Sequence, residues 1–149
     1  MNITRTADYA VRAVIHVAAK SNGRRVPAAR IAKSQSIPPI YVSKVLQALC
    51  RAGILHSTPG RTGGASLAKP AEQISLLEVI EAVDGAMSLN RCVESPESCP
   101  RSGFCVVHDF WEETHTLFAE RLAAKRISEF VAEAQARSGN GDGHPAHAH

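Results

Sequence analysis

Residues 36–68, SIPPIYVSKVLQALCRAGILHSTPGRTGGASLA, hold the pattern that decides the fold. Pro38 disfavours the helical conformation at Ile37, and the fixed φ of Pro39 suits the first turn of a helix. Apolar residues then recur at intervals of three and four, which predicts a helix over residues 39–52 that ends at Gly53. The residues just before Pro39 are therefore predicted to form a tight turn.

The predicted helix has one apolar face and one polar face. Its apolar residues are Val42, Val45, Leu46 and Leu49. Its outward residues are Tyr41, Ser43, Lys44, Gln47 and Arg51. We expect the first set in the core, and the second in solvent or against a partner.

A short hairpin is predicted after this helix. Residues 54–57 and 65–68 are strand candidates, and the tip between them contains Pro59 and three glycines. Upstream, residues 4–20 and 27–34 have the spacing of two further amphipathic helices. Three helices, the last two joined by a tight turn, and then a two-stranded hairpin is the order of a winged helix-turn-helix, a mainly α fold.

The sequence divides into four predicted parts. Residues 1–85 form the winged helix-turn-helix domain, closed by a fourth helix that starts with a capping-box pattern. Residues 86–105 are irregular, because prolines and glycines interrupt any period. Residues 106–136 are predicted to form one long helix, whose surplus apolar residues favour dimerisation. The tail, residues 137–149, is rich in Gly, Ala and His and is expected to be disordered.

The charge is unevenly distributed along the chain. Residues 1–69 contain eleven Lys or Arg and one acidic residue, whereas residues 70–149 contain six Lys or Arg and thirteen acidic residues. The overall net charge of +3 therefore hides a strongly basic N-terminal half. Such a half favours a polyanionic partner, usually nucleic acid, and a solvated basic face is the alternative.

Composition excludes several classes of protein. Hydrophobic residues make up 44% of the chain and charged residues 21%, which excludes a disordered chain or a collagen-like fibre. No stretch approaches about 18 consecutive apolar residues, and the N-terminus lacks the basic-then-apolar order of a signal peptide. We therefore expect a cytoplasmic protein with no membrane partner, in which cysteines stay reduced or bind metal.

Three of the four cysteines lie in the irregular segment. Cys92, Cys99 and Cys105 have the spacing C-x6-C-x5-C, and His108 follows three residues later. Thiolates are ligands that iron–sulfur clusters and zinc select, and a loop lets three of them converge on one centre. An iron–sulfur cluster is favoured, while a zinc site completed by His108 and unrelated buried thiols are the alternatives. Cys50 lies among core positions of the 39–52 helix and is expected only to pack there.

The sequence does not favour an enzyme. It contains no C-x-x-C pair, no Ser/His/Asp nucleophile motif and no phosphate-binding loop. We therefore expect a function of binding and regulation.

Four stretches besides the cysteines carry a resemblance to a known family. They are TADYAVRA (residues 6–13), IYVSKVL (40–46), GRTGG (60–64) and ISLLEVIEAVDG (74–85). Together with the cysteines, they resemble the Rrf2-type winged helix-turn-helix transcriptional regulators, the bacterial group that includes IscR-, NsrR- and RirA-like proteins. The resemblance extends over about residues 1–131.

The resemblance implies a homodimeric DNA-binding regulator, which we interpret as a repressor. In cluster-binding members, the three loop cysteines hold a [2Fe–2S] or [4Fe–4S] cluster that reports nitric oxide, redox state or iron status. For the fourth ligand, Asp8 matches the aspartate that NsrR-like members take from the partner subunit. His108 matches the histidine that IscR-like members place three residues after the last cysteine. Both candidates are present, so the motif does not choose between Asp8 and His108 as the fourth ligand. A zinc-stabilised or cluster-free regulator of the same fold is the alternative function.

The residues that contact an operator are expected on the recognition helix and on the hairpin tip, which is the wing. A recognition helix enters the major groove, and a wing follows the backbone or the minor groove. Wing glycines let the backbone approach the duplex, and an arginine among them can reach a narrow minor groove or a phosphate. The candidates are Tyr41, Ser43, Lys44 and Gln47 on the helix, and Arg61, Thr62 and Gly63 on the wing.

Overall fold

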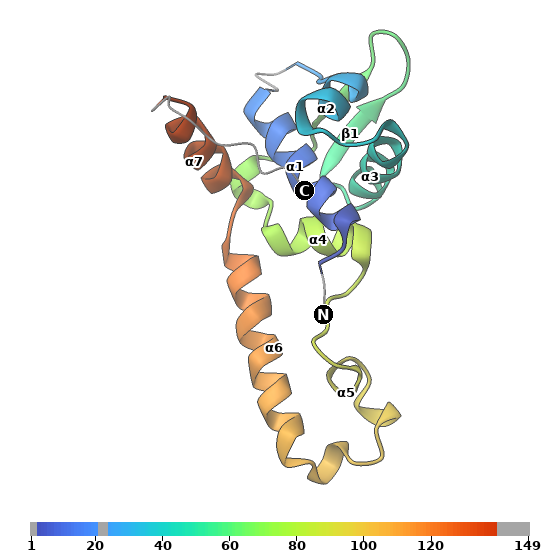
Figure 1. Ribbon diagram of the computed structural model, residues 1–149, viewed down its shortest axis with the longest axis vertical. Helices are drawn as coiled ribbons and strands as arrows, with labels where there is room; N and C mark the ends of the chain where they lie inside the picture. Colours follow the sequence, from blue (N-terminus) through green and yellow to red (C-terminus); the bar gives the residue numbers. More distant parts are fainter. Residues whose placement is uncertain (1–2, 21–23, 140–149) are drawn as a thin grey trace.

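The computed structural model describes residues 3–20 and 24–139 of the 149-residue chain. Helices α1–α4 and α7 gather with a small sheet at one end, and α6 extends away from them (Figure 1). None of the described helices is long and apolar enough to cross a membrane. The helices are α1 (Arg5–Lys20), α2 (Ala28–Gln35), α3 (Pro39–Arg51), α4 (Leu76–Asp84), α5 (Arg91–Glu94), α6 (Val106–Ala124) and α7 (Ile127–Gly139). The strands are β1 (Leu55–Thr58) and β2 (Gly64–Leu67), and short 3-10 turns are η1 (Ala71–Gln73), η2 (Pro96–Ser98) and η3 (Ser102–Phe104).

Helix α1 lies at the centre of the core. Helices α2, α3, α4 and α7 all pack against it. Its inward residues are small or β-branched, which lets these neighbours approach closely. Ala7, Ala10, Ala13, Val14 and Val17 are each 0–1% exposed.

Helices α2 and α3 form the predicted helix-turn-helix. Ser36 ends α2 in the left-handed conformation, with φ of 51°, and Ile37 then inserts into the core. Helix α3 begins at Pro39, and Gly53, with φ of 70°, follows its end. All four residues predicted for its apolar face are buried. The local proline and glycine signals therefore placed this unit correctly.

The two strands pair as an antiparallel hairpin, with Leu55 opposite Leu67 and Thr58 opposite Gly64. The segment before α2 joins this hairpin, because Val26 and Ala65 exchange two backbone hydrogen bonds of 2.8 Å. These bonds tie the wing to the helix-turn-helix as one unit. The predicted fold class, a mainly α winged helix-turn-helix with a two-stranded wing, is confirmed.

The capping box predicted for the fourth helix is present at the start of α4. The Ser75 hydroxyl accepts a 3.1 Å hydrogen bond from the Glu78 amide, and the Glu78 carboxylate accepts a 3.0 Å bond from the Ser75 amide. Lys69 also donates to this carboxylate at 2.6 Å. Burial alone would raise the pKa of Glu78, but the hydrogen bonds from Lys69 and Ser75 outweigh it and lower the pKa. The cap thus fixes the start of α4, which follows the wing and η1.

The prediction of one continuous helix over residues 106–136 is wrong. The chain forms α6 and α7, with an extended break at Lys125 and Arg126. At the break, the Leu76 amide donates to the Lys125 carbonyl at 2.9 Å, and the Ile127 amide donates to the Ile74 carbonyl at 3.0 Å. These bonds replace helical ones and turn α7 back onto α1.

The other two predicted parts can be compared with the structure as well. The segment over residues 86–105 contains only the short turns α5, η2 and η3. The tail predicted over residues 137–149 starts too early, because residues 137–139 still belong to α7. Residues 140–149 lie outside the described residues.

Docking of α7 gives a testable consequence for stability. Ile127 is 0% exposed at the start of α7. We expect Ile127→Ala to lower the free energy of unfolding by about 2–5 kcal/mol, because it leaves a cavity where α7 meets the core. Urea denaturation followed by circular dichroism measures it. Ile40→Ala, the same change at a residue that is 79% exposed, is the control, with an expected effect within about 0.5 kcal/mol. Equal losses for the two variants would contradict the role given to Ile127.

Candidate nucleic-acid interface and cysteine loop

The polar face predicted for the recognition helix is exposed on α3. Ser43, Lys44 and Gln47 are all exposed. Tyr41 is 41% exposed, and its ring packs edge-to-face on Tyr9 of α1 at 5.5 Å between centroids. All four helix candidates are therefore exposed, and Tyr41 also braces α3 against α1.

Ile40 lies on this same face and is absent from the polar candidates. It precedes Lys44 by four residues and Gln47 by seven, which places the three side chains on one side of the helix. Ile40 is 79% exposed. An isoleucine is ordinarily assigned to the core, so the polar pattern missed it. Its spacing from Lys44 and Gln47 is the signal that could have found it.

An open groove separates α3 from the wing. Its volume is about 750 Å³. It is bounded by α3, by the start of α2 and by the hairpin tip. Side chains that line it include Ser43, Gln47, Arg51, Thr58 and Arg61. Four of the seven predicted DNA-contacting residues therefore line one shared groove: Ser43, Gln47, Arg61 and Gly63.

The wing tip depends on its glycines. Gly60 has φ of 100°, and its carbonyl accepts a 3.0 Å hydrogen bond from the Gly63 amide. A Cβ on Gly63 would lie 2.0 Å from the Thr58 carbonyl oxygen, and one on Gly64 would lie 2.6 Å from that of Val26. Gly63 is buried, so in this structure it shapes the turn that exposes the neighbouring Arg61 and Thr62.

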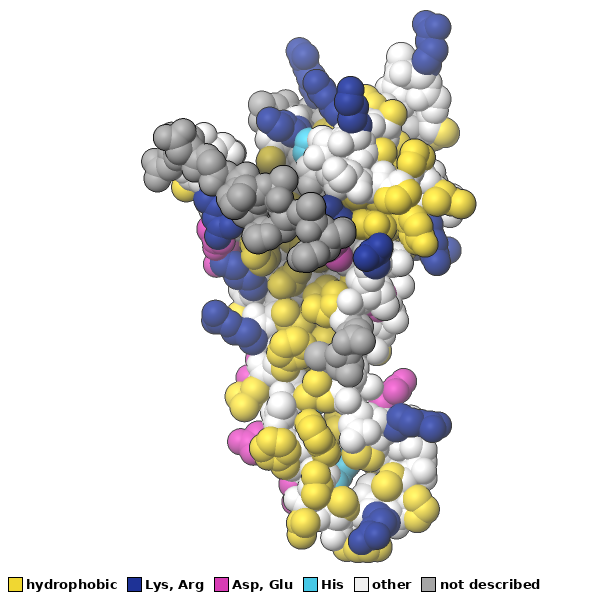
Figure 2. Space-filling model, viewed as in Figure 1, with side chains coloured by type: hydrophobic (Ala, Val, Ile, Leu, Met, Phe, Trp, Pro, Cys, Tyr) yellow, Lys and Arg dark blue, Asp and Glu magenta, His cyan; other side chains and the backbone are white. Residues whose placement is uncertain are grey.

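Basic side chains gather around this groove. Figure 2 shows several Lys and Arg side chains projecting from the end of the molecule that holds α2 and the wing. The exposed basic residues of α2, α3 and the adjoining loops are Arg24, Arg25, Arg30, Lys33, Lys44, Arg51 and Arg61. Because no acidic residue occurs between Asp8 and Glu72, this end has a positive field that suits a polyanion.

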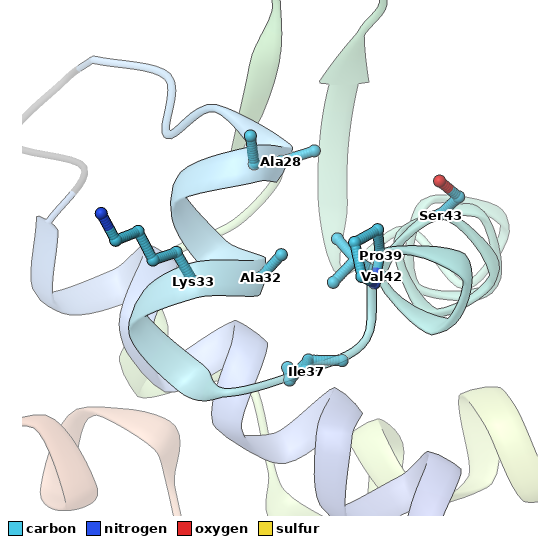
Figure 3. Close-up of a pocket in the computed structure, with 8 residues that line it drawn as sticks. Ala28, Ala32, Lys33, Ile37, Pro39, Val42 and Ser43 are labelled. Atoms are coloured by element: carbon cyan, nitrogen blue, oxygen red, sulfur yellow. The ribbon is translucent and has the colours of Figure 1, made fainter.

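A second hollow lies between the two helices of the helix-turn-helix (Figure 3). Its volume is about 420 Å³, and Ala32, Ile37, Pro39 and Val42 make its lining mainly apolar. Lys33 extends away from α3 in this view. The hollow shares Ala28, Ala29 and Ser43 with the larger groove, so the two form one recessed surface along α3.

The segment that holds the three loop cysteines, from α5 to the start of α6, lies at the far end of the molecule (Figure 1). Cys92 is in α5, Cys99 follows η2, and Cys105 immediately precedes α6; all three are half-buried. Within residues 3–20 and 24–139, no three His, Cys, Asp or Glu side chains come together to hold a metal ion. Sequence proximity therefore places the thiols on one loop without making them converge.

The two candidates for a fourth ligand have different surroundings. His108 lies in the first turn of α6, and its Nδ1 is buried without a hydrogen-bond partner among the described residues. Asp8 lies on α1 and accepts a 2.8 Å ion-pair contact from Arg12, which also donates to the Gln35 carbonyl at 2.7 Å. Three thiols with a buried imidazole nitrogen fit a soft metal centre in the chemistry of their donors. The ion pair with Arg12 uses only Oδ2 of Asp8, so a second carboxylate oxygen is available as a ligand.

Helix α6 carries an exposed apolar stripe. Val107, Phe110 and Leu117 are 48%, 59% and 61% exposed, and Val106 is 89% exposed. The stripe follows the spacing of a helix that packs against another helix. Figure 2 shows hydrophobic side chains along this extended part of the molecule.

The comparisons with known proteins identify transcriptional regulators. Residues 3–133 match the Rrf2 family, described as iron-dependent transcriptional regulators. An HTH-type transcriptional regulator of Haemophilus influenzae is 33% identical over 131 residues, covering 88% of this chain and 87% of that protein. The regulator IscR of Photorhabdus laumondii is 32% identical over 131 residues, covering 88% and 79%.

Solved structures share the fold at low sequence identity. CymR, the global cysteine regulator of B. subtilis, has a TM-score of 0.72 at 20% identity, covering 89% of this chain and 98% of CymR. T. potens IscR has a TM-score of 0.71 at 19% identity, covering 97% and 94%. The named relatives are transcriptional regulators, so the expectation that this chain is not an enzyme is confirmed.

The surroundings of Cys50 predict a different reactivity for this thiol. Cys50 is half-buried against the core, and burial raises the pKa of its thiol. Only the thiolate is nucleophilic, so we expect Cys50 to be alkylated most slowly of the four cysteines in metal-free protein at pH 8. Iodoacetamide labelling followed by peptide mass spectrometry measures the four rates. A rate for Cys50 equal to those of the loop cysteines would contradict its assignment as a packed core thiol.

Proposed function

The chain belongs to the Rrf2 family of transcriptional regulators, and from this premise we propose a homodimeric repressor controlled by an iron–sulfur cluster. As a member of this family, the chain is a DNA-binding regulator of transcription. One observation carries the proposed mode of DNA binding: the polar face of α3 and Arg61 of the wing flank a single groove at the basic end.

In the proposed complex, α3 enters the major groove and the wing lies against the neighbouring backbone or minor groove. Ser43, Lys44 and Gln47 then face the base edges, because they project from the exposed side of α3. Arg61 and Thr62 lie at the tip of the wing, within reach of phosphates. Gly63 contributes by shaping the tip, and Tyr41 by bracing α3 against Tyr9.

The cluster is proposed to be held by Cys92, Cys99 and Cys105, with Asp8 or His108 as fourth ligand. When bound, a [2Fe–2S] or [4Fe–4S] cluster would supply a centre that nitric oxide, oxidants or iron shortage degrade. The cysteine loop connects α4 to α6, and α4 packs on α1. A change in the conformation of this loop can therefore bias the position of α3 through packed helices.

The apolar stripe on α6 supports the proposed homodimer. Phe110 and Leu117 are seven residues apart and exposed, which is the spacing of a two-helix seam. In a homodimer with two-fold symmetry, the same stripe on each subunit would cover the other. The two recognition helices would then be held at a fixed spacing, which suits a palindromic operator.

The cluster assignment predicts which cysteines matter. We expect Cys92→Ala, Cys99→Ala and Cys105→Ala each to abolish cluster retention, because each removes a thiolate from one loop. Cys50→Ala, the matched control, should keep the cluster, since Cys50 packs in the core. Anaerobic visible spectra with iron, sulfide and zinc analysis measure retention. Colourless protein with stoichiometric zinc would instead support the zinc-stabilised regulator.

The same spectra can distinguish the two fourth ligands. Asp8→Ala and His108→Ala are compared in otherwise native protein, and the true ligand is the one whose loss destabilises the cluster or shifts its spectrum. Because Asp8 also pairs with Arg12, Arg12→Ala is the control that removes the ion pair, together with the bond from Arg12 to the Gln35 carbonyl, and keeps the Asp8 carboxylate. An unchanged spectrum in both ligand variants would contradict both assignments.

The α6 stripe predicts the oligomeric state. We expect Leu117→Glu to raise the dimer dissociation constant by at least about tenfold, because burying an unpaired carboxylate costs more than about 1.4 kcal/mol. Sedimentation equilibrium measures this constant. Glu120→Gln, at an exposed position of the same helix, should leave it unchanged. A Leu117→Glu protein that dimerises as tightly as the wild type would exclude this face as the interface.

The DNA interface predicts two different losses. We expect Arg61→Ala to weaken binding to every duplex and to lower the salt slope by roughly one per subunit. Gln47→Ala should cost about 1–3 kcal/mol on the preferred operator and little on random DNA. Titrations with specific and random duplexes at two salt concentrations measure both effects. If cluster-loaded wild-type protein showed no salt-sensitive affinity for DNA, the proposed mode of binding would be wrong.

A further inference from the structure

Ile40 is a large apolar side chain held out in solvent on the recognition helix. It is 79% exposed in the first turn of α3, whereas the apolar side chains Val42, Val45 and Leu46 of the same helix are buried. No packing role within the described chain accounts for an isoleucine at this position. The core of the helix-turn-helix is complete without it.

The surroundings of Ile40 favour DNA over a protein partner. Ile40, Lys44, Gln47 and Arg51 recur at intervals of three and four, so they form one stripe on the exposed side of α3. The stripe contains two cations and no acidic residue, and Arg61 lies across the adjoining groove. Centres of protein interfaces are depleted of lysine, whereas a basic stripe on a helix suits a duplex.

We propose that Ile40 contacts the 5-methyl group of a thymine in the major groove and thereby determines one base of the operator. This inference rests on the proposed function, in which α3 enters the major groove. The thymine methyl is the apolar group that base edges present there, and apolar side chains recognise it. Residues near the start of a recognition helix are those that contact bases, and Ile40 is the second residue of α3.

The side chain is suited to this contact in shape as well as polarity. Isoleucine is branched at Cβ and has one strongly preferred χ1 rotamer in a helix, so little rotamer freedom is lost on binding. Pro39 fixes the backbone immediately before it. Burying one methyl group against Ile40 corresponds to roughly 0.8 kcal/mol, or about fourfold in affinity.

The test uses the full-length dimer and a duplex selected from a random pool by that protein. Each thymine in the selected site is replaced in turn by deoxyuridine, which removes only the methyl group. For wild-type protein, we expect one thymine per half-site whose replacement weakens binding about three- to tenfold. Ile40→Ala should lower affinity for the thymine duplex by a similar factor and show no further loss with deoxyuridine at that position.

Ile3→Ala is the matched control, because it is the same substitution at an exposed isoleucine that lies outside α3 and the wing. This variant should keep the full sensitivity to deoxyuridine. The inference is overturned if no thymine replacement affects the wild type, or if Ile40→Ala remains as sensitive as the wild type. It is also overturned if Ile40→Ala changes the oligomeric state and leaves DNA affinity intact, since Ile40 would then serve a protein contact.

Failure of the inference can be told apart from failure of the proposed function. Wild-type protein that selects a site and binds it with salt-dependent affinity supports the proposed function whatever deoxyuridine does. Wild-type protein that binds no duplex would overturn the proposed function, and the inference with it. Circular dichroism should show an unchanged fold for Ile40→Ala, because the side chain is exposed.

Discussion

The packing of four helices around α1 is the constraint on which the rest of the structure depends. Ala7, Ala10 and Ala13 are each at most 1% exposed, and only side chains this small let α2, α3, α4 and α7 reach α1 together. The polar side of α1 adds a second link, because Arg12 bridges Asp8 and the end of α2. A displacement of α4 or α7 therefore shifts α1, and α1 in turn shifts the recognition helix α3.

The elements that the sequence predicts well are those whose signals are local. Pro39 and Gly53 bound α3 because each restricts or permits a backbone conformation at its own position. The break between α6 and α7 has no such signal, since Lys125 and Arg126 are both good helix formers. The break arises from backbone bonds to Ile74 and Leu76, about fifty residues earlier in the chain. Periodicity cannot detect a partner at that separation.

The candidate site also contains features that the sequence predicts and features that it does not. Exposure of Ser43, Lys44 and Gln47 follows from helical periodicity alone, and the structure agrees with it. Ile40 was missed because hydrophobic character and burial usually coincide, and here they do not. The cysteines show a second limit of sequence patterns: the three thiols lie on one loop as their spacing indicates, and within the described residues this loop, with α5, η2 and η3, does not bring three metal-ligating side chains together. Spacing limits how far thiols can separate, but the loop conformation decides whether they meet.

The separation between the cysteine loop and the basic end restricts how the two can communicate within one chain. The loop lies at the far end of α6 from the globular part (Figure 1), and nineteen helical residues span about 28 Å. The Debye length at physiological ionic strength is only about 8 Å, so a change of charge at the cysteines is screened before it reaches α3. Coupling must then pass through packed elements. Two routes exist in this fold: directly from the loop through α4, and along α6 to the bonds that join Ile127 and Lys125 to Ile74 and Leu76. Both routes reach α4, which packs on α1 and also directly on the recognition helix α3. The contacts of α4 with these two helices are therefore where the proposed regulation of DNA binding would act.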